Sequence, residues 1–332
     1  MKRTWTVHRA VILACALMLA TGVGSVMANG QAQAAATGPQ RLNMGAGWVT
    51  GVYYPLAGAM SRIAHLHMEN ISLTVESSGA SVVNSNLIGR GDLDMAIVQN
   101  DVAYYAYNGL LRDDFQRNPV QNMRGLFTLY PEPVQLVARA DAGIRTPSDL
   151  AGKRVAVGPL GSGAEVNALQ VLEAAGLSEA DLAAAERLEA GEAADYLRDG
   201  RVDAAFFTVG IGASVIADLA VGQRIMIVPI DGEYAQRLLS MEDFYAHATI
   251  PANTYSGVEE ANTIAVVSMV VARAELSEEI VYQFVSKVFE HVDIIHSAHQ
   301  AGRMVTLETA LDGMPIELHP GAQRFFTEQG MR

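Results

Sequence analysis

Short apolar runs alternate with amphipathic segments along most of the chain after residue 40. The runs 93–98 and 155–157 are short, mainly apolar and bounded by glycine or polar residues, as buried strands are, and 41–44 starts a further strand. The segments 53–67 and 278–292 instead carry apolar residues three or four positions apart, which is the spacing of one helix face. Strands that alternate with helices are typical of α/β proteins. The pattern therefore predicts an α/β fold built on a parallel sheet.

The same reading assigns the remaining elements. Two prolines, Pro131 and Pro133, are expected to interrupt a strand, because proline has no N–H to donate to a sheet. The expected strands are 41–44, 72–76, 93–98, 126–130, 134–138, 155–157, 187–189, 202–207, 224–229 and 264–271, with 250–255 extended. The expected helices are 53–67, 82–88, a tyrosine-rich helix around 104–107, 146–150, 166–175, 178–185, 192–198, 211–219, 278–292 and 322–329.

Two glycine-rich turns each join a predicted strand to a predicted helix, at 45–51 and at 158–163. The first N–H groups of a helix have no partner within the helix, and the helix dipole places positive potential there. Glycines let the backbone approach a ligand closely. Such a turn therefore suits an anion, although a plain strand-to-helix turn also needs glycine for its dihedral angles.

The chain also repeats itself. GDLDMAIV at 91–98 and GRVDAAFF at 200–207 share the pattern Gly-x-(Leu/Val)-Asp-x-Ala-apolar-apolar, and each follows an amphipathic segment. The two glycine turns recur in the same order at a similar spacing. One explanation is that strand–helix units resemble one another. The other is two similar lobes, whose strand ends face each other across a cleft that closes on a small molecule.

The N-terminus has the pattern of a secretory signal. Lys2, Arg3 and Arg9 precede an apolar stretch at 10–23. Small-residue cleavage sites follow, so we expect a signal peptide at 1–28, with cleavage as late as 36. A permanent membrane anchor is the alternative, but the apolar stretch is short and is broken by glycine. We therefore expect a soluble protein exported to the periplasm.

Composition narrows the function. The formal net charge of −13 argues against a nucleic-acid partner. The one cysteine, Cys15, lies in the predicted signal, so the mature chain has no disulfide and no thiol chemistry. Nucleotide-binding and serine-hydrolase motifs do not occur, and His291, His296 and His299 do not have a zinc spacing. We expect a protein that is not an enzyme and has no cofactor or metal.

Several motifs, taken in order, resemble one family: the solute-binding proteins of tripartite ATP-independent periplasmic (TRAP) transporters, specifically the TAXI subfamily. The matching motifs are GVYYPL (51–56), GDLDMAIVQ (91–99), DVAY (101–104), LYPEP (129–133), DLAGKRV (149–155), GSG (161–163), PANTY (251–255) and LHPGA (318–322). Two positions depart from the family. Ala164 stands where a threonine is usual, and 209–212 reads Val-Gly-Ile-Gly instead of containing Gly-x-Pro.

The resemblance implies a two-lobed periplasmic binding protein fold (type II-like) with the ligand cleft between the lobes. Lobe 1 comprises 41–130 and 272–332, and lobe 2 comprises 131–271. The implied function is capture of a small anionic or zwitterionic solute, a dicarboxylate of the glutamate or 2-oxoglutarate class, for a TRAP-type membrane permease. An exported binding module that feeds a sensor is the alternative. We expect a monomer.

Candidate ligand contacts come from both lobes. Asp101 is expected either to pair with an ammonium group or to cap the helix that follows it. Ser81 and Asn84 are expected either to cap a helix or to contact ligand, and Glu132 either to contact ligand or to act as a hinge residue. The complete set is Gly47, Thr50, Tyr53, Ser81, Asn84, Gln99, Asp101 and Glu132 from lobe 1 and the crossing, and Ser162, Gly163, Ala164, Phe207, Thr208 and Gly210 from lobe 2.

Overall fold

The structure is a computed structural model that describes residues 39–241 and 244–331. Residues 39–332 form one compact unit. The predicted signal peptide therefore lies outside the described residues. In the part that is described, no helix is both long enough and apolar enough to cross a membrane.

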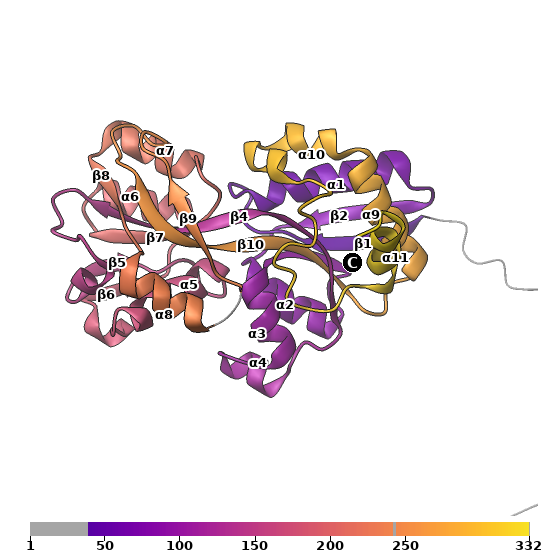
Figure 1. The fold of residues 1–332 in the computed structure, drawn as a ribbon, viewed down its shortest axis with the longest axis horizontal. Coiled ribbons are helices and arrows are strands. Elements are labelled where there is room, and N and C mark those ends of the chain that lie inside the picture. Colours follow the sequence, from indigo (N-terminus) through magenta and orange to yellow (C-terminus); the bar gives the residue numbers. More distant parts are fainter. Residues whose placement is uncertain (1–38, 242–243, 332) are drawn as a thin grey trace, which may run out of the picture. The chain divides into compact units, whose positions relative to one another are not determined.

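The strands belong to one ten-stranded sheet in the order β2-β1-β3-β10-β4-β7-β5-β6, with β8 paired to β4 and β9 paired to β10 (Figure 1). Their bounds are β1 (Gln40–Gly45), β2 (Ile71–Glu76), β3 (Met95–Gln99), β4 (Met123–Arg139), β5 (Arg154–Ala156), β6 (Ala184–Glu186), β7 (Ala204–Thr208), β8 (Ile225–Val228), β9 (Ala246–Ile250) and β10 (Ala261–Arg273).

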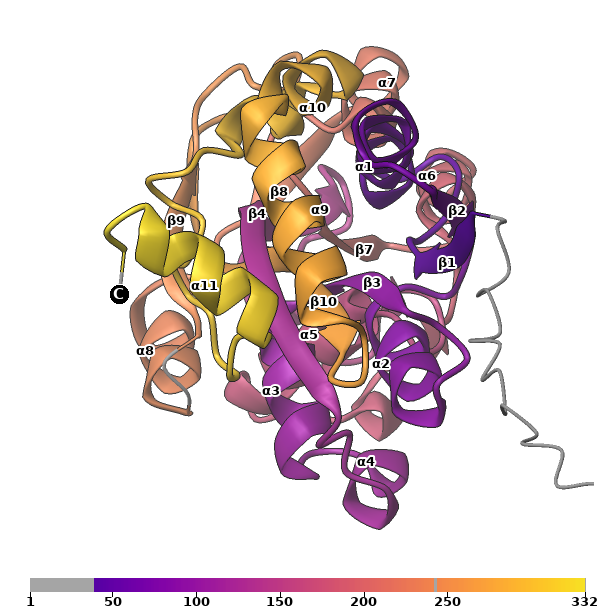
Figure 2. The same cartoon turned by 90° about the vertical axis from the view of Figure 1, so that its right-hand side faces the viewer.

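Helices cover both faces of this sheet. The α-helices are α1 (Tyr53–His67), α2 (Ser81–Arg90), α3 (Asn100–Asn108), α4 (Asp113–Arg117), α5 (Gly163–Ala174), α6 (Ala190–Arg198), α7 (Ser214–Gly222), α8 (Gly232–Met241), α9 (Glu278–Glu290), α10 (Val292–Ala298) and α11 (Pro320–Glu328). Short 3₁₀ helices lie at Pro147–Leu150, Glu179–Asp181 and Gln300–Met304. Figure 2 shows α9 and α11 side by side, where the Phe289 and Phe325 rings stack at 5.8 Å.

The sheet is mixed, which corrects the expectation of a parallel sheet. Strands β2, β1 and β3 run parallel, as do β6, β5 and β7. The two long strands β4 and β10 run antiparallel to each other and to the trios beside them. The alternating strand–helix pattern identifies each parallel trio, whereas the antiparallel centre comes from two strands without helical crossovers.

The prolines do not interrupt β4, which runs unbroken over seventeen residues. The carbonyl of Pro133 accepts a hydrogen bond from the Val209 N–H at 3.4 Å, so this residue directs its backbone polar groups toward β7. Its missing N–H therefore removes no bond to β10. A shift in register between Val267 and Met269 of β10 lies beside Pro131. Proline is tolerated in strands at such irregular places.

Other elements also differ from their predictions. Residues 178–185 do not form a helix, because a capping box between Ser178 and Asp181 closes only a short 3₁₀ turn before β6 begins. Residues 251–257 make turns after β9 and are not extended. Helix α7 begins at Ser214, three residues later than expected. Elements α4, α8 and β9 were not predicted.

The repeat in the sequence corresponds to a repeat in the fold. Asp94 accepts a hydrogen bond from the Asn43 N–H of β1 at 3.0 Å, and Asp203 accepts one from the Arg154 N–H of β5 at 2.9 Å. Each aspartate also pairs with an arginine, Arg273 or Arg154. The aspartate that the two motifs share thus performs the same structural task in each trio.

The apolar core differs between the two faces of the sheet. On the face covered by α2, α3, α5 and α8, one cluster of buried side chains continues from the first trio to the second, from Val98 through Val134 to Val155. On the opposite face the core is divided. One cluster contains α1 and α9 side chains such as Leu56 and Phe284, and a second contains α6 and α7 side chains such as Leu197.

Candidate functional site

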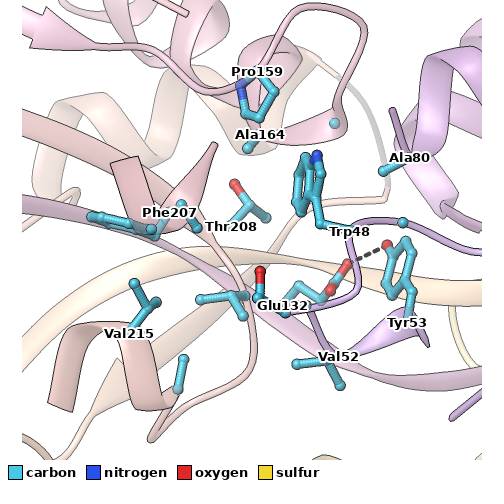
Figure 3. A pocket seen from close by; sticks show the side chains of 18 of the residues that line it. Trp48, Val52, Tyr53, Ala80, Glu132, Pro159, Ala164, Phe207, Thr208 and Val215 are labelled. Atoms are coloured by element: carbon cyan, nitrogen blue, oxygen red, sulfur yellow. Dashed lines mark hydrogen bonds between the residues drawn. The ribbon is translucent and has the colours of Figure 1, made fainter. Parts of the chain in front are cut away.

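A cavity of about 300 Å³ lies where the core is divided. Residues of both trios line it, including Gly47 and Ser81 from one side and Gly163 and Phe207 from the other. Figure 3 shows the side chains that face this space. In open α/β sheets the carboxyl ends of parallel strands are the usual place for a ligand, and Gln99 and Thr208, the last residues of β3 and β7, occupy that place here.

Five helices begin at the wall of this cavity. The lining residues that stand at helix starts are Tyr53 of α1, Ser81 of α2, Gly163 and Ala164 of α5, Ala190 and Gly191 of α6, and Ser214 and Val215 of α7. Each start contributes N–H groups and the positive end of a helix dipole. Within the described residues, the N–H groups of Gly163 and Ala164 have no hydrogen-bond acceptor. The wall is therefore suited to a carboxylate.

Glu132 places a buried carboxylate in the same cavity. Its side chain is 3% exposed. The Tyr53 hydroxyl donates to Glu132 Oε2 at 2.7 Å, the contact dashed in Figure 3, and the Tyr130 hydroxyl donates to Oε1 at 2.9 Å. Burial raises the pKa of Glu132 from 4.5 to about 7, although both phenol hydrogen bonds act to lower it. Burial also raises the pKa of both tyrosines.

Two further polar atoms of the cavity lining are buried without a hydrogen-bond partner: Gln99 Oε1 and Thr208 Oγ1. Unpaired buried polar atoms are uncommon, and each calls for an explanation. The Gln99 side chain lies against Gly163, where a Cβ would come within 1.7 Å of Gln99 Oε1. Gly163 is therefore needed for this close approach between β3 and α5.

The charges around the cavity are mainly acidic. The lining residues include two carboxylates, Glu132 and Asp218, and one histidine, His299. Neither lysine nor arginine is among them. Burial lowers the pKa of His299, which favours its neutral form. Apolar side chains complete the wall, among them Trp48, Val52, Phe207 and Val215.

The structure brings most of the predicted contacts together. Those that line the cavity are Gly47, Thr50, Tyr53, Ser81, Gln99, Glu132, Gly163, Ala164, Phe207 and Thr208. Among these, the Tyr53 hydroxyl is bonded to Glu132. Ser81 is the first residue of α2 and not its cap, and its Oγ accepts from the Gln99 N–H at 3.1 Å.

Four predicted contacts are not part of the cavity wall. Asn84 donates to the carbonyls of Ala46 and Ile97. Ser162 caps α5, since its Oγ accepts from the Glu165 N–H at 3.1 Å. Gly210 packs beside Tyr130.

Asp101, the fourth, is fully buried on α3 and accepts from Asn167 Nδ2 at 2.7 Å. Its pKa is raised from 3.8 to about 7 by burial. Its second oxygen, Oδ1, has no partner in the described part of the chain.

Sequence analysis missed several lining residues. Trp48 and Val52 adjoin residues that were chosen, and Tyr130 is two residues from Glu132 on β4. His299, to which sequence analysis assigned no ligand contact, also lines the cavity. The larger omission comprises Leu188, Ala190, Gly191 and Ala193 around the start of α6, and Ala213, Ser214, Val215 and Asp218 around the start of α7. The first group lies between a strand and a helix that were both predicted, at 187–189 and 192–198, but no ligand contact was assigned there. The second group was placed inside a predicted helix, because α7 begins later than expected.

No group of three or more histidine, cysteine, aspartate or glutamate side chains able to hold a metal ion occurs among the residues that the structure describes. The cavity wall provides hydrogen-bonding groups, helix dipoles and the carboxylates of Glu132 and Asp218.

The fold is similar to those of known binding proteins. The alkanesulfonate-binding protein SsuA from Xanthomonas axonopodis pv. citri, bound to MOPS, matches with a TM-score of 0.51 and 15% identity over 88% of this chain and 85% of that chain. A protein from Bordetella bronchiseptica matches with a TM-score of 0.52 and 14% identity over 86% of this chain and 82% of that chain. The periplasmic aliphatic sulphonate-binding protein SsuA from Escherichia coli matches with a TM-score of 0.47 and 13% identity over 87% of this chain and 79% of that chain.

At these identities the likeness concerns the fold, and the expected α/β fold of a periplasmic binding protein is confirmed. The sequence itself matches the model of one family over residues 44–330, which is nearly all of the described chain. The chain belongs to the NMT1-like family.

Proposed function

We propose that this protein is an exported solute-binding protein that captures a small carboxylate-bearing molecule in the periplasm. The observation that carries the proposal is the cavity itself. It lies at the carboxyl ends of β3 and β7, takes its wall from both trios, and is surrounded by the starts of five helices.

The divided core supports a binding movement. On the cavity side the two apolar clusters are separate, so the halves can move apart there without opening a core. On the opposite side the cluster is continuous and holds the halves together. We keep the lobe boundaries 41–130 with 272–332 and 131–271, with β4 and β10 as the hinge strands.

An exposed polar contact would close the cavity. Gln300 Nε2 donates to the Gly212 carbonyl at 2.8 Å, which joins the 3₁₀ helix Gln300–Met304 to the loop after β7. This contact connects the proposed lobes beside His299 of the cavity wall.

The hydrogen-bond donors in the cavity wall indicate the class of ligand. A carboxylate would accept hydrogen bonds from the free N–H groups of Gly163 and Ala164 at the start of α5. A hydrogen bond to a charged group contributes about 1.5–3 kcal/mol. Together with the TAXI-like motifs, this favours a dicarboxylate of the glutamate or 2-oxoglutarate class. Delivery to a TRAP-type permease by a monomer rests on those motifs alone.

The proposal is tested by thermal unfolding of the chain from residue 39 onward with glutamate, glutamine, 2-oxoglutarate, succinate, malate and neutral amino acids. A ligand at one hundred times its dissociation constant adds about 2.7 kcal/mol to the free energy of unfolding. We expect a clear rise in Tm with at least one carboxylate. If none of these compounds changes the Tm, the proposed ligand class is wrong.

A further inference from the structure

We propose that Glu132, Gln99 and Thr208 form a subsite for a protonated amine, so that the solute is an amino acid and not a keto or hydroxy acid. This inference rests on the proposed binding function and goes beyond it, because it separates ligands that the carboxylate wall alone would treat alike.

The first support is that Glu132 accepts a hydrogen bond at each of its two oxygens. Both of its oxygens receive a hydrogen bond from a tyrosine hydroxyl, Tyr53 at 2.7 Å and Tyr130 at 2.9 Å. Tyrosine donors on both oxygens favour the ionised carboxylate. Each carboxylate oxygen can accept a second hydrogen bond, so the group retains capacity for a ligand that donates.

The second support is the pair of unpartnered atoms beside it. Gln99 Oε1 is an acceptor, and Thr208 Oγ1 can accept as well as donate; both are buried and line the cavity. Thr208 lies opposite Val134 in the β4–β7 ladder, two residues along β4 from Glu132. The Gln99 side chain acts to lower the pKa of Glu132, as a neighbouring polar group does. Three acceptors therefore surround one region, and an ammonium group has three N–H donors.

The third support is the charge of the wall. A buried carboxylate is costly unless an opposite charge accompanies it. Neither lysine nor arginine lines this cavity, so the described wall provides no such partner for Glu132. A ligand ammonium would supply the missing charge. A keto oxygen in the same place can only accept hydrogen bonds, so it would be repelled by the carboxylate of Glu132.

The position of Gln99 connects this subsite to the carboxylate wall. Its carboxamide lies against Gly163, the first residue of α5, whose N–H is free to bind a carboxylate. The acceptor group and the donor group are therefore neighbours. An α-amino acid carries its ammonium and carboxylate on the same carbon atom, and this arrangement of donors and acceptors matches that chemistry.

The test compares ligands that differ only at the amine. Isothermal titration measures L-glutamate against 2-oxoglutarate, and L-leucine against 4-methyl-2-oxopentanoate, with the wild-type chain, Glu132→Gln and Glu173→Gln. Glu173 is an exposed glutamate of α5, so its variant removes the same charge away from the cavity. We expect the amine of at least one pair to bind at least 100-fold more tightly than its keto partner, a loss of at least tenfold in Glu132→Gln, and no change in Glu173→Gln.

The opposite results are equally clear. If the keto acids bind as tightly as the amines, or Glu132→Gln leaves amine affinity unchanged, the amine subsite is wrong while the solute-binding function stands. If no member of either pair binds to the wild type, both proposals fail for these ligands. Thr208→Val provides a second variant should Glu132→Gln unfold: it should weaken amine binding several-fold, and unchanged affinity would also overturn the subsite.

Discussion

The Tyr53 hydroxyl donates a 2.7 Å hydrogen bond to Glu132 and so joins the first turn of α1 to the middle of β4. The bond connects one of the helix starts around the cavity to a strand that runs through both halves of the sheet. It holds a buried carboxylate in one orientation, and the amine subsite depends on that orientation.

Replacing Tyr53 by phenylalanine removes one of the two donors to Glu132. The carboxylate then becomes harder to ionise, because a hydrogen bond to a charged group contributes about 1.5–3 kcal/mol. We expect amine affinity at pH 7 to fall about tenfold or more, measured by isothermal titration. Tyr54→Phe is the matched control, since no hydrogen bond of the adjacent Tyr54 hydroxyl occurs within the described chain. Equal losses in the two variants would contradict the role of Tyr53.

The affinity for an amine should depend on pH. Glu132 must be ionised to bind an ammonium, and its pKa is about 7. Below pH 7 a proton competes with the ligand, so affinity should fall by up to tenfold per pH unit. Well above pH 7 it should level off until the ligand amine itself loses its proton.

Several groups that titrate or bear charge surround Glu132. Tyr53 of α1 and Tyr130 of β4 bond to it, and Asp101 of α3 acts on it through its charge. Asp218 and His299 also line the cavity. Titrations from pH 5.5 to 8 should show the dependence in the wild type and in Asp101→Asn but not in Glu132→Gln. A slope that survives in Glu132→Gln would assign it to another group.

The buried carboxyl group of Asp101 should make the folded chain less stable at neutral pH than it would be with a neutral side chain at this position. Its pKa is raised by burial to about 7, so the folded chain holds the proton where the unfolded chain has lost it. Stability contributed by this group therefore falls as the pH rises from about 4 to about 7 and stays low above that range. Asp101→Asn, whose amide oxygen can still accept from Asn167, should raise the free energy of unfolding at pH 8 by up to about 4 kcal/mol, because each of the roughly three pKa units corresponds to about 1.4 kcal/mol.

Urea unfolding at two pH values checks this. At pH 8 the variant should be more stable than the wild type, and at pH 3.5 the two should be nearly equal. A variant that is less stable at pH 8 would show that the ionised carboxylate is stabilising where it lies.

Ser162→Ala should affect stability and not binding. Its hydroxyl caps α5 and donates to the Pro159 carbonyl at 2.7 Å, so it is already used. Loss of a helix cap costs about 1 kcal/mol. Denaturant unfolding should show this loss while ligand affinity stays within twofold. A tenfold loss of affinity with unchanged stability would restore Ser162 as a ligand contact, the role that its sequence context suggested.

The sequence was informative where local pattern decides structure. The turn before α5, the helix start at Tyr53 and the paired motifs containing Asp94 and Asp203 all follow from spacing and glycine placement. Glu132 could be singled out because it stands between two prolines. Its environment could not be predicted, because Tyr53 and Tyr130 meet it only through the packing of α1 against β4.

The misassignments have a common physical cause. Residues 178–185 favour a helix by composition, but pairing of β6 with β5 takes precedence over that local preference. Ser162 and Asn84 have side chains typical of ligand contacts, yet each satisfies backbone groups of its own neighbourhood. Whether a polar side chain is free for a ligand depends on such contacts, and these become visible only in three dimensions.

The most direct measurement is a crystal structure of the chain with L-glutamate. The account predicts the ligand nitrogen within about 3 Å of Glu132, Gln99 and Thr208 oxygens, which is hydrogen-bonding distance. It also predicts the α-carboxylate at the Gly163 and Ala164 N–H groups. A ligand whose carboxylate lies against Glu132, with its nitrogen elsewhere, would contradict it.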